Sequence, residues 1–173
     1  QVNPFDQPQV EESKVSSRVF LANKEAGKKI QSSEISAVKE MLDGIIDNDY
    51  IAILAYLSPN HSVESALAEF THKLMEMCAI PVSYGFGPAY LHSTGQFHKG
   101  GPRTGKFIQL IDNGIQENLD VPGQDYHFYE LMKAQADGDL NVLMEAGKKI
   151  IRVNVEKDFN AKLKQIVLSV AGG

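Results

Sequence analysis

Apolar residues recur along the chain in two patterns, short continuous runs and stripes at helical spacing. Four runs have the length and composition of strands: YIAILAYL (50–57), IPVSYGF (80–86), KFIQLID (106–112) and KIIRVNV (149–155). Continuous apolar runs bounded by turn residues are typical of strands that are buried on both faces of a parallel sheet. The pattern therefore predicts a largely parallel, fully covered sheet.

Stripes of apolar residues at helical spacing flank these runs and predict helices over 34–48, 61–79 and 158–170. Ser33 is the expected N-cap of the first. The residues expected to form the buried stripes are Ile35, Val38, Met41, Leu42, Ile45 and Ile46 in the first helix, Val63, Leu67, Phe70, Leu74 and Met77 in the second, and Phe159, Leu163, Ile166, Val167 and Val170 in the third.

Two further helices are predicted less directly, from end signals as much as from periodicity. One runs from Pro8 to about Glu25, and Val15, Val19 and Phe20 are its expected buried stripe. The other covers about 127–137, breaks at Gly138, continues as a short helix capped by Asp139 and stops at Gly147.

Strands that alternate with helices predict a three-layer α/β/α sandwich with a mainly parallel sheet of about four or five strands. An N-terminal segment, residues 1–30, would precede a single α/β domain at 31–173. In such sheets, ligands bind beyond the carboxyl ends of the strands. The glycine-rich stretch after 80–86 leaves one such end, so its position suits a binding site.

Composition limits the class of protein. With 173 residues, 43% hydrophobic and 23% charged, the chain is an ordinary globular domain and contains no run of about 20 apolar residues that could span a membrane. Cys78 is the single cysteine, and no signal-like segment begins the sequence, so we expect a cytoplasmic protein without disulfides. The net charge of −5 argues against nucleic acid as a partner, and we expect no membrane partner either.

The segment HSTGQFHKGGPRTGK (92–106) is a cationic island, because no acidic residue lies between Glu76 and Asp112. Its end, GGPRTGK, approaches the phosphate-binding loop G-x-x-x-x-G-K-[ST]. However, Phe107 replaces the hydroxyl residue that would hold magnesium, and FIQLI predicts a strand where that loop needs a helix. A nucleotide site is therefore disfavoured.

A zinc site on His92 and His98 is disfavoured too, since structural zinc usually takes four ligands and Cys78 has no Cys-x-x-Cys partner. We expect neither a metal nor a cofactor. Two interpretations of 92–106 stay open. One is a scaffold hairpin whose glycines adopt positive φ. The other is a contact with a polyanion or sugar phosphate, made by the residues His92, Ser93, Thr94, Gln96, His98, Lys99 and Arg103.

The segment NPFDQPQVEESK (3–14) resembles the C-terminal signature of glucose-6-phosphate isomerase, F-D-Q-x-G-V-E-x-x-K, with Gln9 where the family usually has glycine. YGFGPAYLHSTGQFHKGGPRTG, ELMKAQADGDLNVL and GKKIIRVNV resemble the C-terminal region of bacterial bifunctional transaldolase/glucose-6-phosphate isomerase chains. There, Ala89 replaces an arginine of the pattern. The resemblance covers nearly the whole chain.

The resemblance implies an aldose–ketose isomerase of glycolysis and gluconeogenesis. Lys14 is then the catalytic lysine that assists ring opening of the sugar phosphate, and Gln7 and Glu11 lie beside it as substrate-binding candidates. His92, Ser93, Thr94, His98, Lys99 and Arg103 are the other substrate-binding candidates.

In that family the glutamate base and the histidine would lie upstream of Gln1. The expected partners are therefore the upstream sugar-isomerase domains of the same polypeptide and a sugar-phosphate substrate, while a homo-oligomer stays open. Alone, the chain is expected to be inactive. The alternatives are a scaffold or interface domain of the parent enzyme and an independent phosphate-binding domain.

Overall fold

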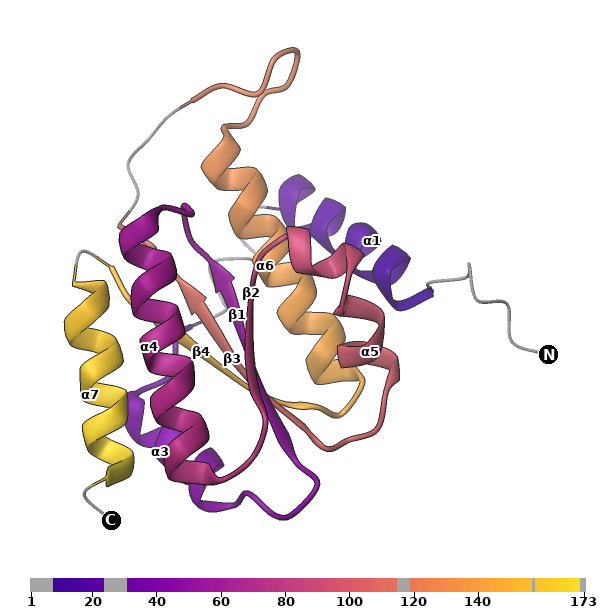
Figure 1. The fold of residues 1–173 in the computed structure, drawn as a ribbon. Coiled ribbons are helices and arrows are strands. Elements are labelled where there is room, and N and C mark those ends of the chain that lie inside the picture. The colour runs from indigo at the N-terminus through magenta and orange to yellow at the C-terminus, as the bar shows by residue number, and fades with distance from the viewer. Residues whose placement is uncertain (1–7, 24–30, 115–118, 157, 172–173) are drawn as a thin grey trace.

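The computed structural model describes residues 8–23, 31–114, 119–156 and 158–171 (Figure 1). Strands and helices alternate through most of the chain. In chain order, the elements are α1 (Pro8–Ala22), α3 (Ile35–Asp43), β1 (Tyr50–Tyr56), α4 (His61–Cys78), β2 (Val82–Phe86), the 3₁₀ helix η1 (Ala89–His92), α5 (Gly95–Gly100), β3 (Gly105–Ile111), α6 (Phe128–Glu145), β4 (Lys149–Asn154) and α7 (Phe159–Ala171).

The four strands form one parallel sheet in the order β2-β1-β3-β4. Ile51 in β1 pairs with Val82 of β2 on one side and with Lys106 of β3 on the other. All four predicted strands are present within a residue or two of their expected bounds. The predicted parallel α/β class is confirmed.

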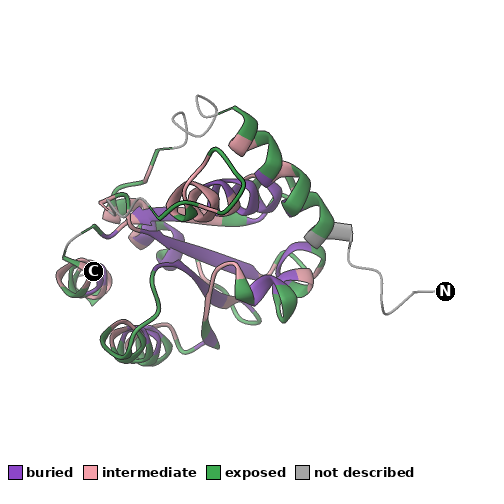
Figure 2. Cartoon of the chain, turned by 90° about the horizontal axis from the view of Figure 1, so that it is seen from above, coloured by how far each residue is buried: buried purple, intermediate pink, exposed green. Residues whose placement is uncertain are grey.

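Side chains of β1 alternate between two cores, as the period of a strand requires. Ile51 and Ile53 face a core shared with α3, α4 and α7, whereas Leu54 and Tyr56 face a core shared with η1 and α6. Viewed from above, buried strands lie between the helices of the two faces (Figure 2). This arrangement makes the predicted three-layer sandwich, and α1 packs outside it, on α5 and α6.

The predicted helix ends hold at α4 and fail at α3. Asn60 caps α4 by accepting a hydrogen bond from the Val63 amide at 3.0 Å. At α3 the N-cap is Glu34, not Ser33, because the Ser33 amide instead donates to the Arg152 carbonyl of β4 at 2.7 Å. The helix ends at Asp43, so the prediction for 34–48 was too long, and Ile46 lies exposed beyond it.

The helices that the structure describes carry polar and charged side chains. The longest, α4 and α6, have 18 residues each, and both carry charged side chains, among them Lys73 and Lys133. Among the helices that the structure describes, none combines the length and the apolar character that crossing a membrane would need.

The predicted buried stripe of α1 is wrong at two of its three residues, while the third, Phe20, is partly buried. Val15 and Val19 are 56% and 57% exposed, while Ser13 and Ser17 are buried against α6. Small side chains are needed there because α1 crosses α6 at backbone contact distance. A Cβ atom added to Gly138 would lie 2.6 Å from Ser17 Oγ and 2.7 Å from its backbone nitrogen.

The same crossing explains why the predicted break at Gly138 is absent. Helix α6 runs without interruption through Gly138, and Asp139 is a buried residue of its interior rather than an N-cap. The cost of a glycine within a helix, about 1 kcal/mol, is offset by the packing that it permits. The predicted stop is confirmed, since Gly147 follows α6 with a left-handed φ of 69°.

We predict that Gly138→Ala detaches or displaces α1, although alanine favours a helix over glycine by about 1 kcal/mol. Rotating a side chain cannot relieve a clash with the Ser17 backbone. Hydrogen exchange should therefore show faster exchange of the α1 amides, with the free energy of unfolding reduced by about 1 to 3 kcal/mol.

Gly44→Ala is the matched control, because a Cβ atom there would meet no neighbour closer than 3.6 Å. Its α1 exchange should equal that of the wild type. Unchanged α1 protection in Gly138→Ala would contradict the close crossing.

Candidate functional site

Lys14, the candidate catalytic residue, lies on the solvent side of α1. Its side chain is 47% exposed, and Nζ lies 2.5 Å from Oε1 of Glu11, one turn earlier. The hydrogen bond from Lys14, together with its charge, holds the pKa of Glu11 below its usual range. The ammonium therefore has a carboxylate beside it and an open side toward solvent. Gln7, the third residue of this motif, lies outside the described residues.

The segment 92–106 is not the hairpin that its glycines suggested. It forms the end of η1, the short helix α5 and an extended entry into β3, and its glycines have no positive φ. Gly95 and Gly105 instead pack tightly: a Cβ atom would lie 3.3 Å from Leu91 and 2.6 Å from Phe107, respectively. The glycines serve helix and strand packing rather than turns.

The seven polar residues of this segment do not converge on one place. His92, Ser93, Thr94 and Arg103 are exposed, Gln96 is partly buried, and His98 and Lys99 are buried. Ser93 Oγ donates to the Tyr90 carbonyl at 3.1 Å, which closes the 3₁₀ turn. The predicted joint site for a polyanion is therefore split between a surface loop and the protein interior.

Helix α5 also lies at a different place from the one expected. His98 Nδ1 is 3.1 Å from the hydroxyl of Tyr50, the first residue of β1. The segment thus leaves the carboxyl end of β2 and returns to the amino ends of the strands. Only η1 stays near the carboxyl end, where ligands of parallel sheets usually bind.

His98 is surrounded by aromatic rings. The ring centroids of Tyr50, Phe97, Tyr90 and Phe107 lie between 5.4 and 6.2 Å from its own. Burial lowers the pKa of His98 to about 4, and the charges of Lys99 and Lys148 act in the same direction. The ring is therefore neutral near pH 7 and serves as a core residue.

We predict that His98 makes the fold acid-sensitive. The folded pKa of about 4 lies below the unfolded value of about 6.5, so the stability that neutral His98 allows is complete above about pH 6.5 and declines toward about pH 4. The loss is about 3 kcal/mol. Urea unfolding at several pH values in that range gives the free energy of unfolding as a function of pH. This free energy should change less with pH for His98→Phe than for the wild type. His72→Gln, which alters an exposed histidine, should leave the pH dependence unchanged.

Lys99 forms an ion pair with Asp139 of α6, and both side chains are almost fully buried. The Lys99 ammonium also lies 5.8 Å from the centroid of the Tyr90 ring. Burial lowers the pKa of Lys99 and raises that of Asp139, so each charge depends on the other. Burial and the nearby Asp139 raise the pKa of the Tyr56 hydroxyl far above its usual value.

A second buried group centres on Asp137, two residues before Asp139 in α6. Arg152 of β4 donates to Asp137 Oδ1 at 2.5 Å and to Gln109 Oε1 of β3 at 2.7 Å. Gln109 Nε2 in turn donates to the Ala136 carbonyl at 2.9 Å, and Lys133 reaches Asp137 at 3.0 Å. These contacts attach α6 to the sheet.

Sequence reasoning missed this network, although two signals were present. An arginine interrupts the apolar run KIIRVNV, and ADGD places two aspartates around a glycine within a helical pattern. A buried charge needs a partner, so Arg152 and the α6 aspartates were candidates for each other. The pairing itself depends on the register of β3 and β4, which sets Gln109 opposite Arg152.

We predict that Lys99→Met destabilises the protein by about 3 to 5 kcal/mol, because it leaves the Asp139 carboxylate buried without a counter-charge. The double variant Lys99→Met/Asp139→Leu removes both charges and should lie within about 1 kcal/mol of the wild type. Chemical unfolding of the wild type, both single variants and the double variant measures the coupling. If the destabilisation of the double variant equals the sum of the two single variants, the proposed coupling between Lys99 and Asp139 is contradicted.

The end of the cationic segment holds no phosphate-binding loop. Lys106 lies in β3, buried, with Nζ 3.0 Å from Oδ2 of Asp49. Arg103 lies against the end of α6, where a Cβ atom on Gly147 would be 3.3 Å from the Arg103 guanidinium carbon. Among the described residues, no three of His, Cys, Asp and Glu are grouped so that they could hold a metal ion.

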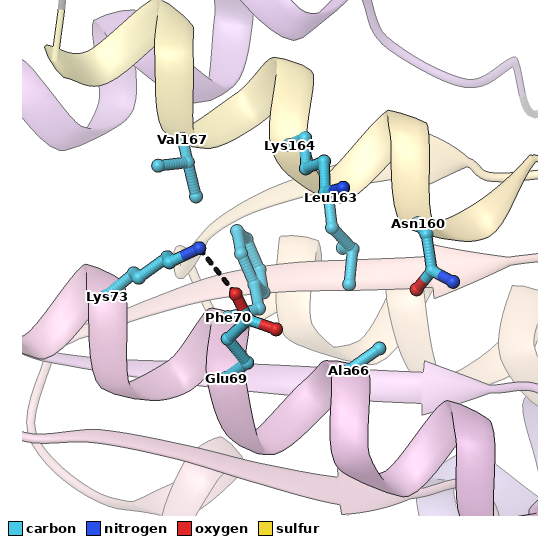
Figure 3. A pocket seen from close by; sticks show the side chains of 8 residues that line it. All are labelled: Ala66, Glu69, Phe70, Lys73, Asn160, Leu163, Lys164 and Val167. Carbon is cyan, nitrogen blue, oxygen red and sulfur yellow. Dashed lines mark hydrogen bonds and ion pairs between the residues drawn. The ribbon is translucent and has the colours of Figure 1, made fainter.

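Two pockets among the described residues have none of the predicted site residues in their lining. Between α4 and α7, a pocket of about 40 Å³ has Phe70, Leu163 and Val167 around it and the Lys73–Glu69 pair, 2.5 Å apart, at its rim (Figure 3). That volume holds no more than a few water molecules. A larger pocket of about 590 Å³ lies at the amino ends of β1 and β2.

Comparison with known proteins adds information on the fold alone. No family model and no curated protein matches the sequence. Among solved structures, the chain is similar to a hypothetical protein, TT0462, from Thermus thermophilus, with a TM-score of 0.65 and 15% sequence identity. The match covers 95% of this chain and 43% of that chain, so this chain spans less than half of its neighbour's length.

Proposed function

We propose that this chain is the C-terminal domain of an enzyme that interconverts glucose 6-phosphate and fructose 6-phosphate, and that it supplies Lys14 to a composite active site. The observation that carries the proposal is the position of Lys14. The lysine of the isomerase-like signature is on the solvent side of a helix that packs on a rigid α/β domain.

Exposure and charge suit Lys14 to the proposed step. Ring opening of a sugar phosphate needs a proton donor at the ring oxygen, and an ammonium can donate there or orient the hydroxyl that loses its proton. Its positive charge also favours an anionic substrate. Glu11 Oε1, 2.5 Å away, accepts a hydrogen bond from the ammonium and so holds the Lys14 side chain in place.

The proton transfer between C1 and C2 needs a second base, which this proposal assigns to the upstream domains. Lys14 then acts before and after that transfer, when the ring opens and closes. The proposed site is therefore shared between α1 of this domain and the upstream part of the enzyme.

The burial of His98 and Lys99 favours a scaffold role for this part of the chain. Both side chains are enclosed between α5, α6 and the sheet, where a substrate cannot reach them. Helix α5 contacts α1 and thus supports the helix that carries Lys14. This second candidate function, a scaffold or interface domain, applies to α5 and is compatible with a catalytic α1.

We predict that Lys14→Met lowers kcat/KM by about 10² to 10⁴-fold in the full-length enzyme that contains this chain, because a proton donor is lost. A coupled isomerase assay measures the turnover, and thermal unfolding should be unchanged. Lys73→Met is the matched control, since Lys73 forms the same 2.5 Å pair with Glu69 on α4, across the sheet from α1.

Mixing separates catalysis from scaffolding. The upstream part, expressed separately, should gain activity when the wild-type chain is added and gain none from the Lys14→Met chain. Full activity of the upstream part alone would contradict the proposal and leave a structural role for this domain.

A further inference from the structure

A mostly apolar pocket lies at the amino ends of β1 and β2, the lower end of the sheet in Figure 1. Its volume of about 590 Å³ falls within the usual range for small-molecule sites, about 300 to 1,000 Å³. The isomerase proposal makes no use of it, since Lys14 does not line it. Its lining comes from the turn before β1, the α4–β2 connection and α5.

One wall of this amino-end pocket is aromatic. Phe97 is 53% exposed, and its ring centroid lies 5.4 Å from that of Tyr50. The two residues after Phe97 are buried, so α5 directs this one large apolar side chain outward, into the pocket. Ile80, Pro81 and Val82 also line the pocket and form its apolar floor.

The other wall is acidic. Asp47 and Asp49 both line the pocket, and none of the lining residues is a lysine or an arginine. Asp49 is buried, and its carboxylate already has partners within the protein. It pairs with Lys106 at 3.0 Å and accepts a hydrogen bond from the Ile46 amide at 3.1 Å. Asp47 is exposed, and no ion pair joins it to another residue in the described part of the chain.

The walls are held in place before any ligand arrives. Lys106 fixes Asp49 from behind, and the contact between Tyr50 and His98 fixes the aromatic wall from inside the protein. A pre-formed site loses less conformational entropy on binding than a mobile one.

We propose that the amino-end pocket binds an organic cation that carries an aromatic or aliphatic body. The body would lie against Phe97, Tyr50 and the apolar floor. The positive group would lie near Asp47, at the rim, where the carboxylate and the faces of the aromatic rings both attract a cation. An anion finds no positive side chain on these walls, so sugar phosphates are not ligands of this pocket.

A charge series on one aromatic body tests the proposal: phenethylammonium, phenethyl alcohol and phenylacetate. Titration of the full chain, followed by ¹H–¹⁵N correlation spectra, should show saturable shifts at residues 47–51 and 79–83 with phenethylammonium. The uncharged alcohol should bind about fivefold more weakly or worse, because it loses about 1 kcal/mol of attraction to Asp47, and phenylacetate should not bind.

Two variants locate the binding. Asp47→Asn keeps the shape and should weaken phenethylammonium about fivefold without changing the affinity for phenethyl alcohol, whereas Phe97→Ala should weaken both. Asp43→Asn, which removes the same charge close by but outside the pocket, should leave both affinities unchanged. Unshifted spectra away from the substituted residue verify that each variant is folded.

The proposal is overturned by any of three results: no saturable shifts with phenethylammonium, equal affinity for the amine and the alcohol, or equal effects of Asp47→Asn and Asp43→Asn. These measurements use no sugar phosphate and no isomerase assay. If the binding tests overturn the pocket proposal, the isomerase proposal is unaffected. If the isomerase assays overturn the isomerase proposal, the pocket proposal is unaffected.

Discussion

One turn of α6 joins the sheet, α1 and α5, and the rest of the structure depends on it. Asp137 pairs with Arg152 and fastens the helix to β4, Gly138 admits α1 at backbone contact distance, and Asp139 pairs with Lys99 and fastens α5. Buried charges without partners would be costly, so these pairs exclude packings that separate them. A single tripeptide thus determines where α1, and with it Lys14, lies.

The polar residues of this chain divide into those that hold the fold and those that face solvent. His98 and Lys99 belong to the first group, because both are buried and stabilise α5 on the sheet. His98 is neutral there, and Lys99 is paired with Asp139. Lys14 belongs to the second, with an exposed ammonium on a helix that the first group supports. In the proposed function, the buried residues act only by positioning the exposed one.

The molecule offers two different surfaces on the two sides of α5. Toward α1 lies the ammonium of Lys14, which suits an anionic sugar phosphate. Toward the amino ends of β1 and β2 lies a pocket with aromatic and acidic walls, which suits a cation. In the two proposals, electrostatic complementarity assigns an anionic ligand to one surface and a cationic ligand to the other.

The sequence alone determined the strands, most helices and the parallel α/β class, because apolar periodicity reports directly on burial in regular elements. It also singled out Lys14 through the signature-like segment. Only the tertiary structure decided that Ser13 and Ser17, not Val15 and Val19, are the buried face of α1, since that depends on a glycine more than a hundred residues away. It likewise decided that Lys99 is buried: in the sequence a lysine looks solvated, and its counter-charge, Asp139, is supplied by a distant helix.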